Sequence, residues 1–137
     1  MQRLTPNMAV KDIKETINYY VKNFGFKLIM AVSDDKSAIG DTLEEGKEYV
    51  WANVMHGDVG LMFQREDSFK EDIGDTYKQI GASLGLYLEV DEVDALYEKV
   101  KESVNIHKAI DSTWYGAREF YVCDCNGYIL GFSEMKK

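Results

Sequence analysis

Apolar residues occur at every second position of the stretch LTPNMAV, from Leu4 to Val10. A period of two is typical of a strand with one buried face. The next stretch has apolar residues at helical spacing up to Phe24, and Gly25 then supplies a stop. Asp12 stands where its side chain can cap the first turn. The pattern therefore predicts a strand at 4–10 and a helix near 12–24.

Three strand-like runs complete the first half of the chain. They are FKLIMAV, YVWANVM and VGLMFQ. The polar stretch 33–48 joins the first two, and an HGD turn joins the last two. Residues 4–65 are therefore predicted to form a β-α-β-β-β unit.

The same order returns after a second polar segment, 66–82. SLGLYLEV reads as a strand, 91–103 as a helix, and IHKAI, REFYVCD and YILGFSE as three more strands. Val10 and Val90 close equivalent strands, which gives an offset of 80 residues between the copies. We expect an α+β fold of two βαβββ modules, 4–65 and 83–134, within one domain spanning 1–137. The connections 33–48 and 66–82 are candidates for mobility.

Composition and charge narrow the class of protein. The chain has 137 residues and a formal net charge of −8, with no cluster of Lys or Arg. Nucleic acid is therefore not an expected partner. Neither a membrane-spanning apolar run nor a signal peptide is recognisable, so we expect no membrane partner and a cytoplasmic location.

Three stretches resemble the vicinal oxygen chelate superfamily, which groups glyoxalase I, ring-cleaving dioxygenases, fosfomycin-resistance enzymes and bleomycin-resistance proteins. They are MAVKDIKETINYYVKNFGFKL, LYLEVDEVDALYEKV and WYGAREFYVCDCNGYILGF, which together cover nearly all of residues 4–134. The resemblance implies that each module forms a half-barrel and that the two make a cup. It also implies pairing as a homodimer.

The third stretch contains the chain's two cysteines, Cys123 and Cys125. The sequence DCNG, residues 124–127, stands where the superfamily has a hairpin turn, and Asp, Asn and Gly suit turn positions. Two thiols at this spacing would need further ligands to hold a metal. We therefore predict a turn with two reduced thiols and an exposed Cys125.

The resemblance also implies where metal ligands would stand in the metal-dependent members. These positions fall on Thr5, Gly85, Gly131 and either Leu61 or Met62, none of which is a competent ligand. His56 and His107 lie outside the motif positions. We therefore expect no metal and no cofactor, as in the metal-free bleomycin-resistance-like branch.

Strand alternation assigns side chains to the face away from each helix. With Leu84, Leu86 and Leu88 against the helix, Tyr87 and Glu89 face the cup, and the same argument applies to the other strands. For each aromatic residue the alternative is core filling. The predicted ligand-binding residues are Asn7, Trp51, Asn53, Tyr87, Glu89, Trp114, Tyr115 and Tyr121.

Flat side chains beside Asn and Glu suit a planar, partly cationic organic ligand. The sequence thus favours a metal-independent protein that sequesters an aromatic or cationic small molecule, with no catalytic residue assigned. One alternative is a lyase or isomerase of the glyoxalase type with a non-standard or metal-free site, in which Tyr87 or Glu89 acts as general acid or base. A non-catalytic regulatory module is the other.

Overall fold

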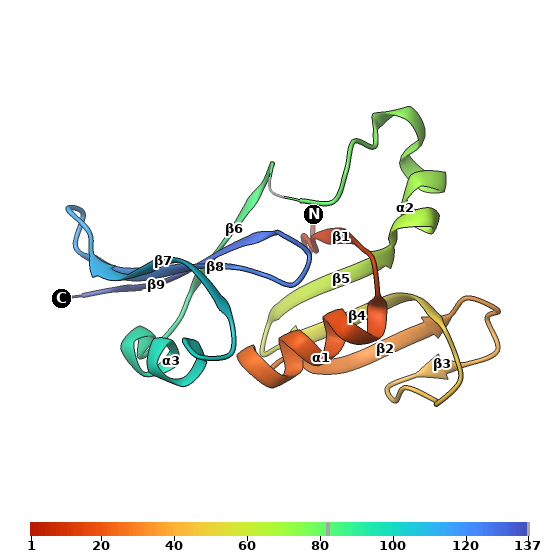
Figure 1. Cartoon of the computed structure of the whole chain (residues 1–137), viewed down its shortest axis with the longest axis horizontal. Coiled ribbons are helices and arrows are strands. Elements are labelled where there is room, and N and C mark those ends of the chain that lie inside the picture. The colour runs from red at the N-terminus through yellow and green to blue at the C-terminus, as the bar shows by residue number, and fades with distance from the viewer. Residues whose placement is uncertain (82, 137) are drawn as a thin grey trace. The chain divides into compact units, whose positions relative to one another are not determined.

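In a computed structural model that describes residues 1–81 and 83–136, the chain forms two compact units. The first runs from Met1 to Ile80 and the second begins at Gly81 (Figure 1). None of the helices in this described part is long and apolar enough to cross a membrane.

The first unit is a mixed sheet with a helix on one face. Its strands lie in the order β1-β5-β4-β2-β3, and only β1 and β5 run parallel. Its elements are β1 (Asn7–Val10), α1 (Ile13–Phe24), β2 (Lys27–Ser33), β3 (Ile39–Gly40), β4 (Tyr49–His56), β5 (Val59–Arg65), α2 (Glu66–Ile73) and the 3₁₀ helix η1 (Gly74–Thr76).

The second unit repeats this arrangement. Its strands lie in the order β6-β9-β8-β7, with β6 and β9 parallel, which matches β1-β5-β4-β2 strand for strand. Its elements are β6 (Gly85–Glu89), α3 (Val93–Val100), β7 (Asn105–Ser112), β8 (Ala117–Cys123) and β9 (Ile129–Met135). The predicted α+β fold of two βαβββ modules is confirmed.

Helix α1 covers one face of the first sheet (Figure 1). The Asp12 carboxylate accepts a bond of 2.9 Å from the backbone N–H of Glu15, and Gly25 ends the helix with a φ of 70°. The fully buried Tyr20 ring lies 5.1 Å from the ring of Phe63 in β5. Capping and apolar spacing therefore both act as the sequence predicted.

Helix α3 packs on the second sheet through Tyr97, whose ring lies 5.1 Å from that of Phe120. The residue before this helix, Glu92, has a φ of 54° and makes no side-chain capping bond. Glu134 on β9 caps the helix instead, accepting a bond of 3.1 Å from the N–H of Val93. Bonds to Lys136 and then to backbone N–H groups hold the pKa of Glu134 below its ordinary value.

Two strands begin later than the alternation predicted. Leu4 and Leu84 are 87% and 65% exposed, and β1 and β6 start at Asn7 and Gly85. Pro6 has no N–H to donate, so it cannot extend the β1 ladder as a donor. Gly85 pairs with Ile129, which is where β9 begins.

The connection 66–82 is more structured than predicted, since it contains α2 and η1. No side chain of α2 is buried, and its only apolar residues, Phe69 and Ile73, form a stripe one turn long, which is too short to predict a helix. Ala82 lies outside the described residues.

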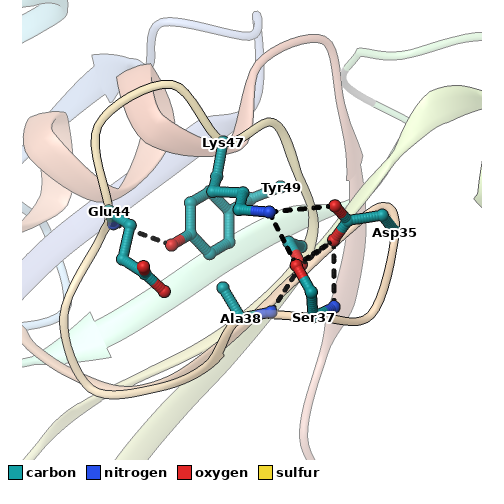
Figure 2. A network of polar contacts seen from close by, with 7 residues as sticks. Asp35, Ser37, Ala38, Glu44, Lys47 and Tyr49 are labelled. Atoms are coloured by element: carbon teal, nitrogen blue, oxygen red, sulfur yellow. Dashed lines mark hydrogen bonds and ion pairs between the residues drawn. The ribbon is translucent and has the colours of Figure 1, made fainter.

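Hydrogen bonds between polar groups hold the connection between β2 and β4 in its conformation (Figure 2). The Asp35 carboxylate accepts bonds from the hydroxyl and the N–H of Ser37, at 2.7 and 2.9 Å, and from Lys47 Nζ at 3.0 Å. These bonds, chiefly those from Ser37, hold the pKa of Asp35 well below its ordinary range. The Tyr49 hydroxyl accepts a bond of 2.8 Å from the N–H of Glu44.

The predicted turn between β8 and β9 is present. The Asp124 carboxylate accepts bonds from the N–H groups of Asn126 and Tyr128, at 2.9 and 2.8 Å, and Gly127 has a φ of 91°. Neither cysteine forms a disulfide, and Cys125 is exposed while Cys123 is half-buried.

Candidate functional site

The predicted site residues lie on the sheet faces opposite α1 and α3 or in a loop beside them. In the first unit Trp51 and Asn53 alternate with buried residues of β4, and Asn7 lies two strands away on β1. In the second unit Tyr87 and Glu89 lie on β6 and Tyr121 on β8. Trp114 and Tyr115 lie in the β7–β8 loop.

Strand register arranges the second unit's face in two rows. Tyr87 and Tyr121 flank Gly131, since each pairs with it across one strand spacing. Glu89 and Glu119 flank Ser133 in the same way. Predicted residues on separate strands are thus brought together here. Of these six residues, Gly131, Ser133 and Glu119 were not among the predicted ligand-binding residues.

Glu119 is the centre of this face. It is 8% exposed, and its carboxylate accepts hydrogen bonds from the hydroxyls of Tyr87 and Tyr115, at 2.8 and 2.5 Å. Sequence reasoning singled out both tyrosines but not their acceptor. The signal was available, because Glu119 precedes Tyr121 by two residues and therefore shares its face.

The phenols of Tyr115 and Tyr121 remain protonated at neutral pH. The hydrogen bond to Glu119 and loss of solvent raise the pKa of Tyr115 well above its ordinary value. Burial, followed by the negative charge of Glu119, raises the pKa of Tyr121. These tyrosines therefore serve as hydrogen-bond donors rather than bases.

Tyr121 also occupies the space above Gly131. A Cβ at position 131 would lie 2.8 Å from Cε2 of the Tyr121 ring, which is closer than real Cβ contacts. The surroundings of the ring include a cation, since Lys108 Nζ lies 5.8 Å from the ring centroid. No side chain can stand at position 131 unless Tyr121 moves.

An open pocket of about 520 Å³ adjoins Glu119. It shares Tyr87, Glu89 and Ser133 with the rows described above. In the β7–β8 loop, Trp114 is 95% exposed and stands edge-on to Tyr115, with 5.2 Å between the ring centroids. The pocket is lined by Tyr87, Glu89, Val90, Asp91, Ser133, Glu134 and Met135. Its acidic lining favours a positively charged ligand.

In the first unit, Gln64 on β5 links the predicted residue Asn7 to helix α2 by hydrogen bonds. Gln64 Nε2 donates to Asp72 Oδ2 and to Ser68 Oγ on α2, both at 2.8 Å, while Gln64 Oε1 accepts from Asn7 Nδ2 at 2.8 Å. Asn53 donates to the Leu61 carbonyl at 3.2 Å. Gln64 and Asp72 were not predicted. Gln64 directly opposes Trp51 in the register, so the same alternation could have identified it.

The donor set does not fit a divalent metal at the positions that the resemblance implies. Gly85 and Gly131 offer no side-chain donor, and Leu61 is buried and apolar. His56 and His107 are exposed, on β4 and β7. Within residues 1–81 and 83–136, no three His, Cys, Asp or Glu side chains are grouped so as to hold a metal ion.

Comparisons with known proteins agree with the fold. The model of the Glyoxalase/Bleomycin resistance protein/Dioxygenase superfamily matches residues 3–132. The comparison with curated proteins gives no match.

Solved structures match over almost the whole chain. A glyoxalase-related enzyme from Fulvimarina pelagi is 16% identical, with a TM-score of 0.73 over 98% of this chain and 88% of its own. A protein of unknown function from Agrobacterium tumefaciens is 21% identical, with a TM-score of 0.71 over 98% and 94%. TioX from Micromonospora sp. ML1 is 16% identical, with a TM-score of 0.69 over 98% of each chain. At such identities the likeness concerns the fold, because one fold hosts many functions.

Proposed function

Because the chain belongs to the glyoxalase/bleomycin resistance protein/dioxygenase superfamily, we propose that it is a metal-independent member that binds and sequesters a small aromatic or cationic organic compound. The contact between Tyr121 and Gly131 carries this proposal. The position where the resemblance implies a metal-binding carboxylate has no side chain, and an aromatic ring covers it. The face thus offers an organic ligand rings and hydrogen-bond partners instead of a metal.

Each group on this face has a role in such binding. The rings of Tyr87, Tyr115 and Trp114 are exposed and provide flat surfaces for stacking, worth about 0.5–1.5 kcal/mol per ring beyond burial. Glu119 is fixed by its two phenol donors and supplies negative charge. No step of bond making or breaking is required of any of them.

Thermal-shift screening against antibiotics and small metabolites, with and without a chelator, tests the proposal. A ligand at 100 times its dissociation constant stabilises a protein by about 2.7 kcal/mol, enough for a clear rise in melting temperature. We expect the rise to be the same with EDTA present. Metal analysis of the purified protein is the control. A stoichiometric transition metal, or binding lost with EDTA, would contradict a metal-independent site.

One observation favours the alternative of a metal-free lyase or isomerase. A carboxylate held in place by hydrogen bonds from Tyr87 and Tyr115 is positioned to act as a general base toward a bound compound. Chemical change of a bound compound, lost in Glu119→Gln, would support this enzyme over the binder. A compound recovered unchanged after long incubation would support the binder.

We further propose that the protein works as a homodimer. Trp114 is almost fully exposed and lies beside Tyr115, forming an apolar loop surface of the kind that interfaces or ligands cover. A two-fold contact would cover this loop in both copies.

A further inference from the structure

The carboxylate of Glu119 is buried without a counter-charge. Only 8% of the residue is exposed, and its hydrogen bonds come from two neutral phenols. Among the described residues it enters no ion pair. The nearby Lys108 lies over the ring of Tyr121. Removing a carboxylate from water is costly unless a cation and good hydrogen bonds compensate. The two phenols supply hydrogen bonds but no positive charge.

Resting on the function proposed above, we propose that the ligand carries a cationic nitrogen with N–H donors, an amine, amidine or guanidine, that binds the Glu119 carboxylate. Each carboxylate oxygen accepts one phenol bond and keeps acceptor capacity for a further donor. An N–H cation uses that capacity and supplies the missing charge in one contact. Charge-assisted bonds of this kind are shorter and stronger than neutral ones.

The surroundings of Glu119 suit an organic cation. Tyr87 and Tyr115 donate hydrogen bonds to this carboxylate, and the pKa of Tyr121 is raised by burial and by the nearby charge of Glu119. The rings of these tyrosines can contact the charged nitrogen or the flat body of the ligand. Glu89 pairs with Ser133 on the side opposite Glu119, and its carboxylate adds negative charge to the lining of the adjoining pocket. A single carboxylate with neutral phenols suits an organic cation better than a metal ion, which needs several strong ligands.

Calorimetric titration of the full chain with benzamidine and with benzamide tests the inference. The two probes have nearly the same shape, but only benzamidine is charged. We expect benzamidine to bind saturably and benzamide to bind at least tenfold more weakly. Glu119→Gln keeps the side chain's size and should weaken benzamidine binding at least tenfold. Glu102→Gln, in the exposed turn after α3, makes the same charge change and should leave the affinity unaltered.

The outcomes separate this inference from the proposed function. Equal affinity for the two probes, or an unchanged affinity in Glu119→Gln, would overturn the cation inference while leaving small-molecule binding intact. The cation inference also fails if only neutral compounds from the thermal screen bind. If no compound of either kind binds, both proposals fail. Should Glu119→Gln not fold, the comparison of probes on the unmodified protein still decides.

Discussion

At the scale of single residues, Gly131 and Tyr121 provide a direct test of how the site is packed. A Cβ at position 131 would meet the Tyr121 ring at 2.8 Å, whereas a Cβ at Gly85, on β6, would meet nothing within 4 Å. Both glycines lie in strands and neither has a positive φ. They therefore form a matched pair that differs in available space.

We expect Gly131→Ala to lower the free energy of unfolding by about 1–2 kcal/mol, as overpacking does, and Gly85→Ala to change it little. Urea denaturation of both variants measures this. In a Tyr121→Ala background the cost of Gly131→Ala should fall by about 1 kcal/mol, because the contact is gone. Equal costs in both backgrounds would show that the ring does not occupy this space.

Tyr115 makes the stability of the folded protein fall at alkaline pH. Glu119 raises the pKa of Tyr115 in the folded protein, so the folded state keeps this proton where the unfolded chain, with an ordinary pKa near 10, releases it. The unfolded state therefore binds fewer protons above about pH 10, and stability falls as the pH rises.

Tyr115→Phe should weaken this fall, because the substituted ring has no proton to lose. Denaturation curves at pH 8, 10 and 11 compare the two proteins. Part of the fall in stability with pH should remain in the variant, because the pKa of Tyr121 is also raised. At pH 8 the variant should be less stable through the lost hydrogen bond. Identical slopes with pH would refute the assigned coupling between Tyr115 and Glu119.

At the scale of elements, helices α1 and α2 differ in what stabilises them. Helix α1 has a capping Asp12, an apolar stripe and a Gly stop, so its sequence alone predicts it. Helix α2 buries none of its side chains and is joined to β5 by the bonds from Gln64. The apolar pair Phe69 and Ile73 gives a periodic signal only one turn long, which is why the segment was predicted only as a polar connection.

Gln64→Ala should loosen α2 selectively. Amide hydrogen exchange followed by mass spectrometry should show faster exchange in residues 66–76, while α1 exchanges as before and serves as the internal reference. Asp72→Asn keeps an acceptor oxygen for Gln64 and should have a smaller effect. Unchanged exchange in α2 after the loss of Gln64 would mean that other contacts stabilise it.

The candidate site shows the same division between local and tertiary information. Alternation within β6 and β8 was enough to place Tyr87 and Tyr121 on one face. It did not reveal Glu119 as their shared centre, because that depends on register between β8, β9 and β6 and on the reach of Tyr115 from a loop. Pairing across strands is set by the whole sheet, and the sequence of one strand does not encode it.

At the scale of the whole molecule, the repeated strand order of the two units agrees with the offset of 80 residues between Val10 and Val90. Duplication could be recognised because each copy retains the pattern of a strand, a helix and three strands, although few residues are shared. The ligand is not encoded in this pattern, since the pattern specifies the sheets and not the side chains on their open faces.

The proposed homodimer makes a prediction at this scale. Sedimentation velocity at micromolar concentration should give a mass of about twice the 15.7 kDa of the chain. The physical reason is the exposed pair Trp114 and Tyr115, whose apolar surface a second copy would cover. Trp114→Ala should shift the equilibrium toward monomer and leave the fold intact. A monomer at all concentrations would contradict the dimer and leave the loop free to contact ligand.

The ring of Tyr121 over Gly131 also constrains the order in which this chain could change during evolution. The resemblance implies a carboxylate at position 131 in metal-dependent members, yet a larger side chain introduced there first would collide with the ring. Tyr121 would have to move aside or become smaller, and a smaller residue there would remove a ring from the polar face. Under the proposed function, such a change of Tyr121 weakens ligand binding before a carboxylate at position 131 gains room. A single substitution at position 131 does not by itself make space for that carboxylate.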